Sequence, residues 1–156
     1  QIKQLLPAGK IQTIYSSPLQ RCFKLAGALH EDPMELVTDQ RIKELNFGEW
    51  ELKRWSEIDG EAREKWKSDF VFAPAPGGES HMDLYRRAED FLNDLTGHHK
   101  QNVLVVTHGG VMKSLLSKIL DMPLEKSYAI KLHYGEMIYI RYIHHQAVQV
   151  EFLSGR

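Results

Sequence analysis

The chain has 156 residues, of which 42% are hydrophobic and 26% charged, as is typical of one soluble globular domain. A formal net charge of −1 gives no electrostatic footprint for nucleic acid or an anionic membrane, and no apolar run has transmembrane length or resembles a signal peptide. The single cysteine, Cys22, excludes an internal disulfide and fits a small core residue in a reducing cytoplasm.

The first six residues predict the end of an amphipathic helix that stops near Pro7-Ala8-Gly9. This helix begins without a cap, and no initiator methionine precedes it. We therefore expect that upstream sequence is missing from the chain.

Apolar runs then alternate with segments of helical periodicity, which predicts a three-layer α/β/α fold with a mainly parallel sheet. The expected strands are 11–16, 36–38 and 102–107, the expected helices are 19–30, 79–95 and 110–120, and a terminal hairpin joins 136–142 to 147–153. Residues 41–78 are charged, contain Trp50, Trp55 and Trp66, and end in the break at 73–78. We expect them to form a lid or pocket wall within one domain, 1–156.

The segment from Val103 to Val111 carries the strongest functional signal. Four apolar residues predict a buried strand, and the Thr-His-Gly-Gly sequence that follows leads into a helix. This order places His108 at the carboxyl end of a parallel strand, where open α/β sheets bind ligands. Glycines allow close approach to the backbone, and a helix N-terminus favours an anion. The pattern favours phosphate chemistry. The alternative is a polar turn that merely ends the strand, which would have the same sequence pattern.

Two further residues are candidates for the same edge. Arg21 follows the first predicted strand and begins a helix, where a guanidinium can bind phosphate in a bidentate manner; the alternative is a surface arginine. Glu44 lies in an aromatic-rich loop and could serve as a general acid; the alternative is an ordinary exposed glutamate, and Glu49 and Glu51 compete for the role.

Four motifs occur in this order along the chain: Ser17-Pro18-Leu19-Gln20-Arg21, Glu44-Leu45-Asn46-Phe47-Gly48-Glu49-Trp50-Glu51, Pro76-Gly77-Gly78-Glu79-Ser80 and Val106-Thr107-His108-Gly109-Gly110. Together they resemble the histidine phosphatase superfamily, which includes the phosphoglycerate mutases, and among its members the α-ribazole phosphatases in particular. The resemblance covers essentially the whole chain and implies a phosphoglycerate mutase-like fold.

The resemblance implies a role for each candidate. Arg21 matches the arginine that clamps the phosphate, and Glu44 matches the proton donor to the leaving oxygen. His108 matches the second active-site histidine, which binds the phosphoryl group, and Gly109 adds a backbone N–H. Glu79 belongs to a motif that either contacts substrate or caps its helix.

The family's nucleophilic histidine lies in an Arg-His-Gly or Arg-His-Thr motif at the end of a first strand, and no such motif occurs in this chain. We expect that the strand is missing too, which leaves an unpaired sheet edge, and that this chain alone is inactive.

For the intact protein, the resemblance implies metal-independent hydrolysis of a small-molecule phosphate ester, α-ribazole 5′-phosphate in cobalamin biosynthesis, through a phosphohistidine intermediate. It implies no cofactor and no nucleic-acid or membrane partner, and it leaves a homodimer open. A broad-specificity phosphatase, a phosphoglycerate mutase and a non-catalytic phosphate-binding module are the alternatives.

Overall fold

The computed structural model describes residues 2–6, 11–98, 102–143 and 146–153. The predicted helices and strands are present, with their ends shifted by a few residues; the predicted helix end at 7–9 lies outside the described residues. The elements are α1 (Ile2–Leu5), β1 (Thr13–Ser16), α2 (Gln20–Leu29), β2 (Glu35–Thr38), α3 (Gly60–Ser68), α4 (His81–His98), β3 (Val103–Val106), α5 (Gly109–Ile119), α6 (Leu124–Ser127), β4 (Met137–Ile143) and β5 (Gln146–Leu153), with 3₁₀ turns at Gln40–Ile42, Gly48–Trp50 and Trp55–Glu57.

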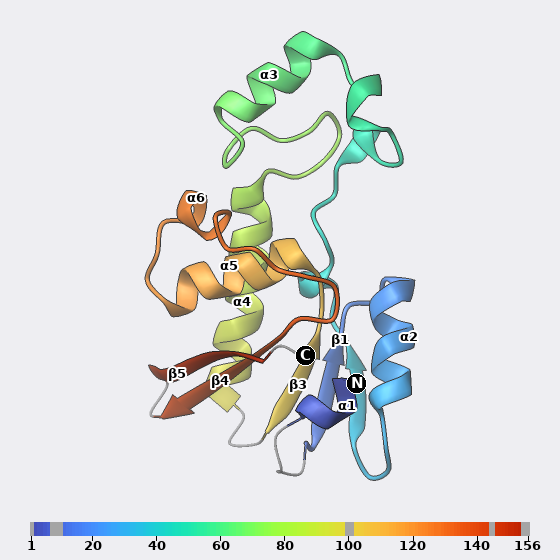
Figure 1. Ribbon diagram of the computed structural model, residues 1–156, viewed down its shortest axis with the longest axis vertical. Helices are drawn as coiled ribbons and strands as arrows, with labels where there is room; N and C mark the ends of the chain where they lie inside the picture. Colours follow the sequence, from blue (N-terminus) through green and yellow to red (C-terminus); the bar gives the residue numbers. More distant parts are fainter. Residues whose placement is uncertain (1, 7–10, 99–101, 144–145, 154–156) are drawn as a thin grey trace.

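A parallel sheet of three strands forms the centre of the molecule, in the order β2-β1-β3. Thr13 of β1 lies opposite Glu35 of β2 and Val103 of β3, so the three strands end at the same edge. Their carboxyl ends point toward the segment that contains α3 (Figure 1). This arrangement confirms the predicted α/β class and brings the turns after β1 and β3 together.

Helices cover both faces of this sheet because side chains alternate along each strand. Ile14 and Val106 pack with the buried face of α2 on one side. On the other side, Tyr15 and Val105 pack against the core beneath α4 and α5. Tyr15 meets Phe91 of α4 edge to face, with ring centroids 5.6 Å apart. These two cores give the predicted three layers.

Helix α4 begins with a reciprocal capping box. Ser80 Oγ accepts a hydrogen bond from Asp83 N at 3.1 Å, and Asp83 Oδ2 accepts one from Ser80 N at 3.0 Å. The expected cap at Glu79-Ser80 is therefore made by Ser80. Glu79 has other partners, which belong to the candidate site.

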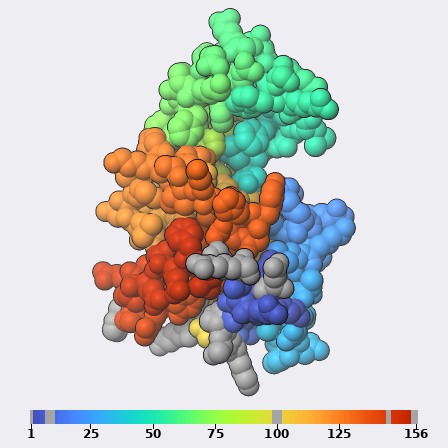
Figure 2. Space-filling view, in the orientation of Figure 1, coloured from blue at the N-terminus to red at the C-terminus, as the bar shows by residue number. Residues whose placement is uncertain are grey.

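Within the segment 41–78, Ile42 and Leu45 pack in the core beneath α4 and α5, whereas the rest forms a lobe at one end of the molecule (Figure 2). Its three tryptophans pack edge to face on one another, with ring centroids 6.2, 6.0 and 5.7 Å apart. The lobe leaves and rejoins the sheet-bearing part through two paired segments, 46–49 and 76–79, here called the neck.

The neck is held by backbone hydrogen bonds between its two segments. Glu49 N donates to Pro76 O, and Glu79 N donates to Asn46 O, each at 2.8 Å. Gly48 has a φ of +51°, and a side chain there would overlap the carbonyl oxygen of Pro76. Only glycine combines this backbone conformation with such a close approach.

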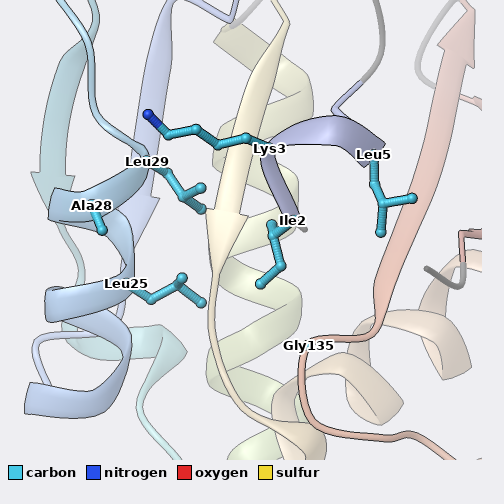
Figure 3. Close-up of a pocket in the computed structure, with 7 residues that line it drawn as sticks. All are labelled: Ile2, Lys3, Leu5, Leu25, Ala28, Leu29 and Gly135. Atoms are coloured by element: carbon cyan, nitrogen blue, oxygen red, sulfur yellow. The ribbon is translucent and has the colours of Figure 1, made fainter. Parts of the chain in front are cut away.

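In the described part of the chain, one edge of β3 pairs with no other strand, and no strand covers the apolar surface beside this edge. β3 pairs with β1 alone, and β4 and β5 form a separate antiparallel sheet. Near this edge, α1 and α2 line an open pocket of about 430 Å³ with Gly135 (Figure 3). The lining residues are Ile2, Lys3, Leu5, Leu25, Ala28, Leu29 and Gly135. Among the helices of the described ranges, none has the length and apolar character needed to cross a bilayer.

Candidate active site

His108 lies where β3 passes directly into α5. It is the N-cap residue of α5, its backbone is extended, and its side chain is only 5% exposed. The N-terminus of an α-helix carries free N–H groups and partial positive charge, which favour an anion beside this imidazole. Gly109 begins α5, and the space beside its Cα is open, so a ligand can approach the backbone at this point.

Hydrogen bonds fix the tautomer of His108. Arg21 Nε lies 3.1 Å from Nδ1, and because a guanidinium N–H can only donate, Nδ1 is the acceptor. The neutral ring therefore carries its proton on Nε2, which donates to Ser17 Oγ at 2.8 Å. Cys22 Sγ lies 3.4 Å from Nε2 and donates to the carbonyl oxygen of Thr107 at 3.3 Å. The predicted core cysteine thus also packs against the imidazole.

The environment of His108 keeps its ring neutral. Burial, and then the positive charge of Arg21, lower the pKa of His108 from 6.5 to about 4, against the opposing effect of the Glu44 carboxylate. A phosphoryl dianion placed beside the ring would act in the opposite direction and favour the charged form. We therefore expect the protonation of His108 to respond to an anionic ligand.

Arg21 lies on the first turn of α2, at the same sheet edge as His108. Its Nε is used by the imidazole, whereas its two Nη groups have no acceptor among the residues that the structure describes. The side chain is exposed. A guanidinium held at one end and open at the other can present two N–H groups to phosphate oxygens.

The Glu44 carboxylate lies against the first turn of α5. Oε1 accepts a hydrogen bond from Leu45 N at 3.0 Å, and Oε2 lies at a longer 3.4 Å from Gly110 N. A side chain on Gly110 would overlap Oε1, so glycine is required to admit this carboxylate. The structure thus brings Arg21, Glu44 and His108 to one edge of the sheet, where phosphate binding and proton donation can be combined.

The carboxylate of Glu79 is half-buried and pairs with Arg87. Oε1 accepts from Arg87 Nε at 2.8 Å, and Oε2 accepts from Arg87 Nη2 and Asn46 N, each at 3.0 Å. Burial raises the pKa of Glu79, but the hydrogen bonds from Arg87 and Asn46 outweigh it and hold the pKa below its ordinary value. Glu79 is therefore ionised and adjoins the segment that carries Glu44.

An aromatic cluster connects the lobe to the site. His81 Nδ1 donates to the carbonyl oxygen of Phe70 at 2.7 Å, and its ring contacts Trp66 and Tyr128 with centroids 5.5 and 4.7 Å apart. Burial, and then the charge of Glu44, raise the pKa of Tyr128. The same carboxylate acts on His81, whose pKa burial nevertheless lowers. Both rings therefore lie within electrostatic range of Glu44.

Arg87 and Ser17 are site residues to which the sequence reasoning assigned no role. Arg87 had a detectable signal, because it lies within the apolar stripe formed by Leu84, Ala88 and Phe91 on α4. An arginine in such a stripe indicates buried partners. Ser17 is completely buried, but a serine at the end of a strand carries no comparable signal.

Comparison with known proteins identifies relatives of this arrangement. The model of the histidine phosphatase superfamily (branch 1) matches residues 1–153. The chain is 34% identical over 127 residues to a candidate phosphoserine phosphatase 2 of Hydrogenobacter thermophilus, covering 79% of this chain and 63% of that protein. It is 28% identical over 138 residues to the adenosylcobalamin/alpha-ribazole phosphatase of Escherichia coli K12, covering 84% of this chain and 67% of that protein.

A solved structure shares the fold over almost the whole chain. The crystal structure of a candidate alpha-ribazole-5′-P phosphatase from Escherichia coli K-12 superposes with a TM-score of 0.86 at 25% identity, covering 99% of this chain and 78% of that one. The chain thus has the α/β fold of that protein and spans about two thirds of the length of the two relatives matched by sequence.

Proposed function

We propose a phosphomonoester hydrolase function for this chain, which belongs to the histidine phosphatase superfamily (branch 1). The observation that supports it most directly is the contact between Arg21 and His108 beside the Glu44 carboxylate. In this proposal the cation and the imidazole bind a phosphoryl group, and the carboxyl group beside them exchanges a proton with the ester oxygen.

The proposed reaction proceeds in two steps. A histidine nitrogen attacks phosphorus, the ester P–O bond breaks, and protonated Glu44 gives its proton to the leaving oxygen. Water then attacks the phosphohistidine, the P–N bond breaks, and Glu44 takes the proton from the water. Arg21 binds the phosphoryl oxygens through its open Nη groups in both steps, and His108 joins it by moving its Nε2–H from Ser17 Oγ to a phosphoryl oxygen; both stabilise the charge of these oxygens.

The nucleophile in this proposal is a histidine outside the 156 residues. His108 is buried, accepts from Arg21 and donates to Ser17, and no Arg-His-Gly or Arg-His-Thr motif occurs in the sequence. The chain by itself is therefore expected to bind phosphate without turning over an ester. Loss of a nucleophile costs on the order of 10⁶-fold in a well-studied hydrolase.

The proposed substrate is α-ribazole 5′-phosphate. The E. coli relative and the E. coli structure both carry alpha-ribazole phosphatase names, and Trp66 of the lobe packs against His81, which lies within electrostatic range of Glu44. Phosphoserine is the competing substrate, because it is named for the H. thermophilus relative.

The test measures phosphate release from both esters in the presence of EDTA, using this chain and a longer protein that includes an Arg-His motif. The longer protein should release phosphate from α-ribazole 5′-phosphate, and Glu44→Gln should abolish most of this activity. Glu49→Gln is the matched control, because Glu49 is an exposed glutamate of the same loop. Equal losses in the two variants would remove Glu44 from the mechanism, and preference for phosphoserine would replace the proposed substrate.

Binding of inorganic phosphate to the 156-residue chain tests the site separately from turnover. Calorimetry should detect phosphate binding that Arg21→Met removes, because this change deletes the two open Nη groups. Absence of phosphate binding, or binding unaffected by Arg21→Met, would refute the site itself.

A further inference from the structure

Arg87 uses every N–H of its guanidinium within the protein. Nε donates to Glu79 Oε1 at 2.8 Å, and Nη1 donates to the carbonyl oxygens of Arg41 and Lys43 at 2.6 and 2.7 Å. Nη2 donates to the carbonyl oxygen of Glu44 and to Glu79 Oε2, each at 3.0 Å. A guanidinium has five N–H donors, and these contacts occupy all of them. Arg87 therefore has no donor left for a ligand, although it lies beside the site.

The contacts of Arg87 fall on the segment that carries Glu44. The remaining carbonyl oxygen of that segment, on Ile42, accepts from Thr107 Oγ1 at 2.8 Å. On the other side of Glu44, Asn46 N donates to Glu79, which Arg87 itself holds. Every carbonyl from residue 41 to residue 44 is thus bound by a side chain, three of them by Arg87.

This bonding leaves the Glu44 carboxylate little freedom to move. Its backbone is held by Arg87, and its carboxylate lies between Leu45 N and the first turn of α5. Arg87 is also near enough for its charge to lower the pKa of His108. The guanidinium therefore connects helix α4 to both the proton donor and the phosphate site.

We propose that Arg87, paired with Glu79, is a positioning residue that sets the reach of Glu44 to the leaving oxygen. The proposal rests on the proposed function, because it assigns Glu44 the proton transfer. A lysine at position 87 keeps the charge but has only three donors on one nitrogen, so it cannot hold three carbonyls and a carboxylate together. Displacement of a catalytic group by about 1 Å costs on the order of 10²-fold in rate.

Leaving-group dependence distinguishes positioning from a general effect on folding. An alkyl phosphate needs a proton on its leaving oxygen, whereas p-nitrophenolate leaves without one. In the full-length protein, Arg87→Lys should lower kcat/KM, which reports phosphoryl transfer to the enzyme, about 10²-fold on an alkyl phosphate and leave kcat/KM on p-nitrophenyl phosphate nearly unchanged. Glu79→Gln should show the same bias to a smaller degree, since the amide keeps one acceptor oxygen.

Arg86→Lys is the matched control. Arg86 is the neighbouring residue on α4, its side chain is 71% exposed, and its ion pair with Asp83 is 3.7 Å long. This variant should turn over both substrates like the unmodified protein. Equal losses on both substrates in Arg87→Lys, or no loss on either, would overturn the proposal.

A measurement without turnover separates this proposal from the proposed function. The amide resonances of Leu45 and Gly110, which report on the Glu44 carboxylate, should shift in Arg87→Lys and remain in place in Arg86→Lys. Unchanged amide resonances in Arg87→Lys would refute the positioning role. If the unmodified protein hydrolysed neither ester, the proposed function would fail, and the amide shifts alone would decide the role of Arg87.

Discussion

Replacing His108 with glutamine should flatten the acid limb of the stability profile. The imidazole has a folded-state pKa of about 4, lowered from 6.5 by burial and by Arg21. At pH values between these two pKa values, the imidazole is protonated in the unfolded chain but neutral in the folded chain. The free energy of unfolding therefore falls as the pH drops from 6.5 toward 4, and this contribution is complete above 6.5. Glutamine does not titrate, so the variant lacks this term.

The size of the effect follows from the difference between the two pKa values. Each pH unit between them is worth 1.36 kcal/mol, and the interval from 6.5 to about 4 gives ~3 kcal/mol at full value. Partial screening by solvent reduces this to about 2 kcal/mol. The carboxylates whose folded pKa values are lowered, such as Glu79, also lose stability in acid, but they do so equally in both proteins.

The assay is urea unfolding at pH 7 and pH 4.5 for the unmodified chain and for His108→Gln. The fall in the free energy of unfolding between these pH values should be about 2 kcal/mol smaller in the variant. Glutamine can change the absolute stability at pH 7, so the comparison concerns only the fall. An equal fall in the two proteins would show that His108 titrates normally and would refute the reasoning from burial and Arg21.

Three further substitutions test single contacts. Gly110→Ala should displace the Glu44 carboxylate and lower turnover of an alkyl ester about 10²-fold, while the protein stays folded because alanine favours the helix by ~1 kcal/mol; full activity would disprove the contact. Gly48→Ala should lower the free energy of unfolding by at least ~2 kcal/mol, from its positive φ and the overlap with Pro76, and urea melts showing less would contradict the neck geometry. Ser17→Ala should lower the free energy of unfolding by about 1–3 kcal/mol, because it leaves the imidazole N–H without this acceptor. Unchanged stability in the same urea melts would show that this hydrogen bond is not formed.

The strands and helices were predictable because their signals are local. Four apolar residues before Thr107 predict a strand, and the glycines after His108 mark the passage into a helix, so the end of β3 could be located without a structure. The parallel order of the strands then brings the ends of β1 and β3 to one edge. The convergence of Arg21 and His108 follows from this topology.

The role of Arg87 could not be predicted in the same way. Three of its acceptors are backbone carbonyl oxygens. Because every residue type has a backbone carbonyl, the sequence contains no signal for these hydrogen bonds. Its carboxylate partner, Glu79, precedes the helix and looks like a capping residue. The contact of Tyr128 with His81 has the same difficulty, because it joins α6 to the start of α4 through tertiary packing alone.

Under the proposed function, the neck lies between the candidate phosphate site and the tryptophan-rich lobe. Its two hydrogen-bonded segments fix the ends of the loop that carries the tryptophans, so the loop's interior can be exchanged without moving its anchors. Doubling the length of a loop whose ends are held costs only about 0.6 kcal/mol. Grafting a different loop between Glu49 and Pro76 that keeps Trp66 and Phe70, the partners of His81, is therefore the experiment that would show whether the lobe sets the ester preference.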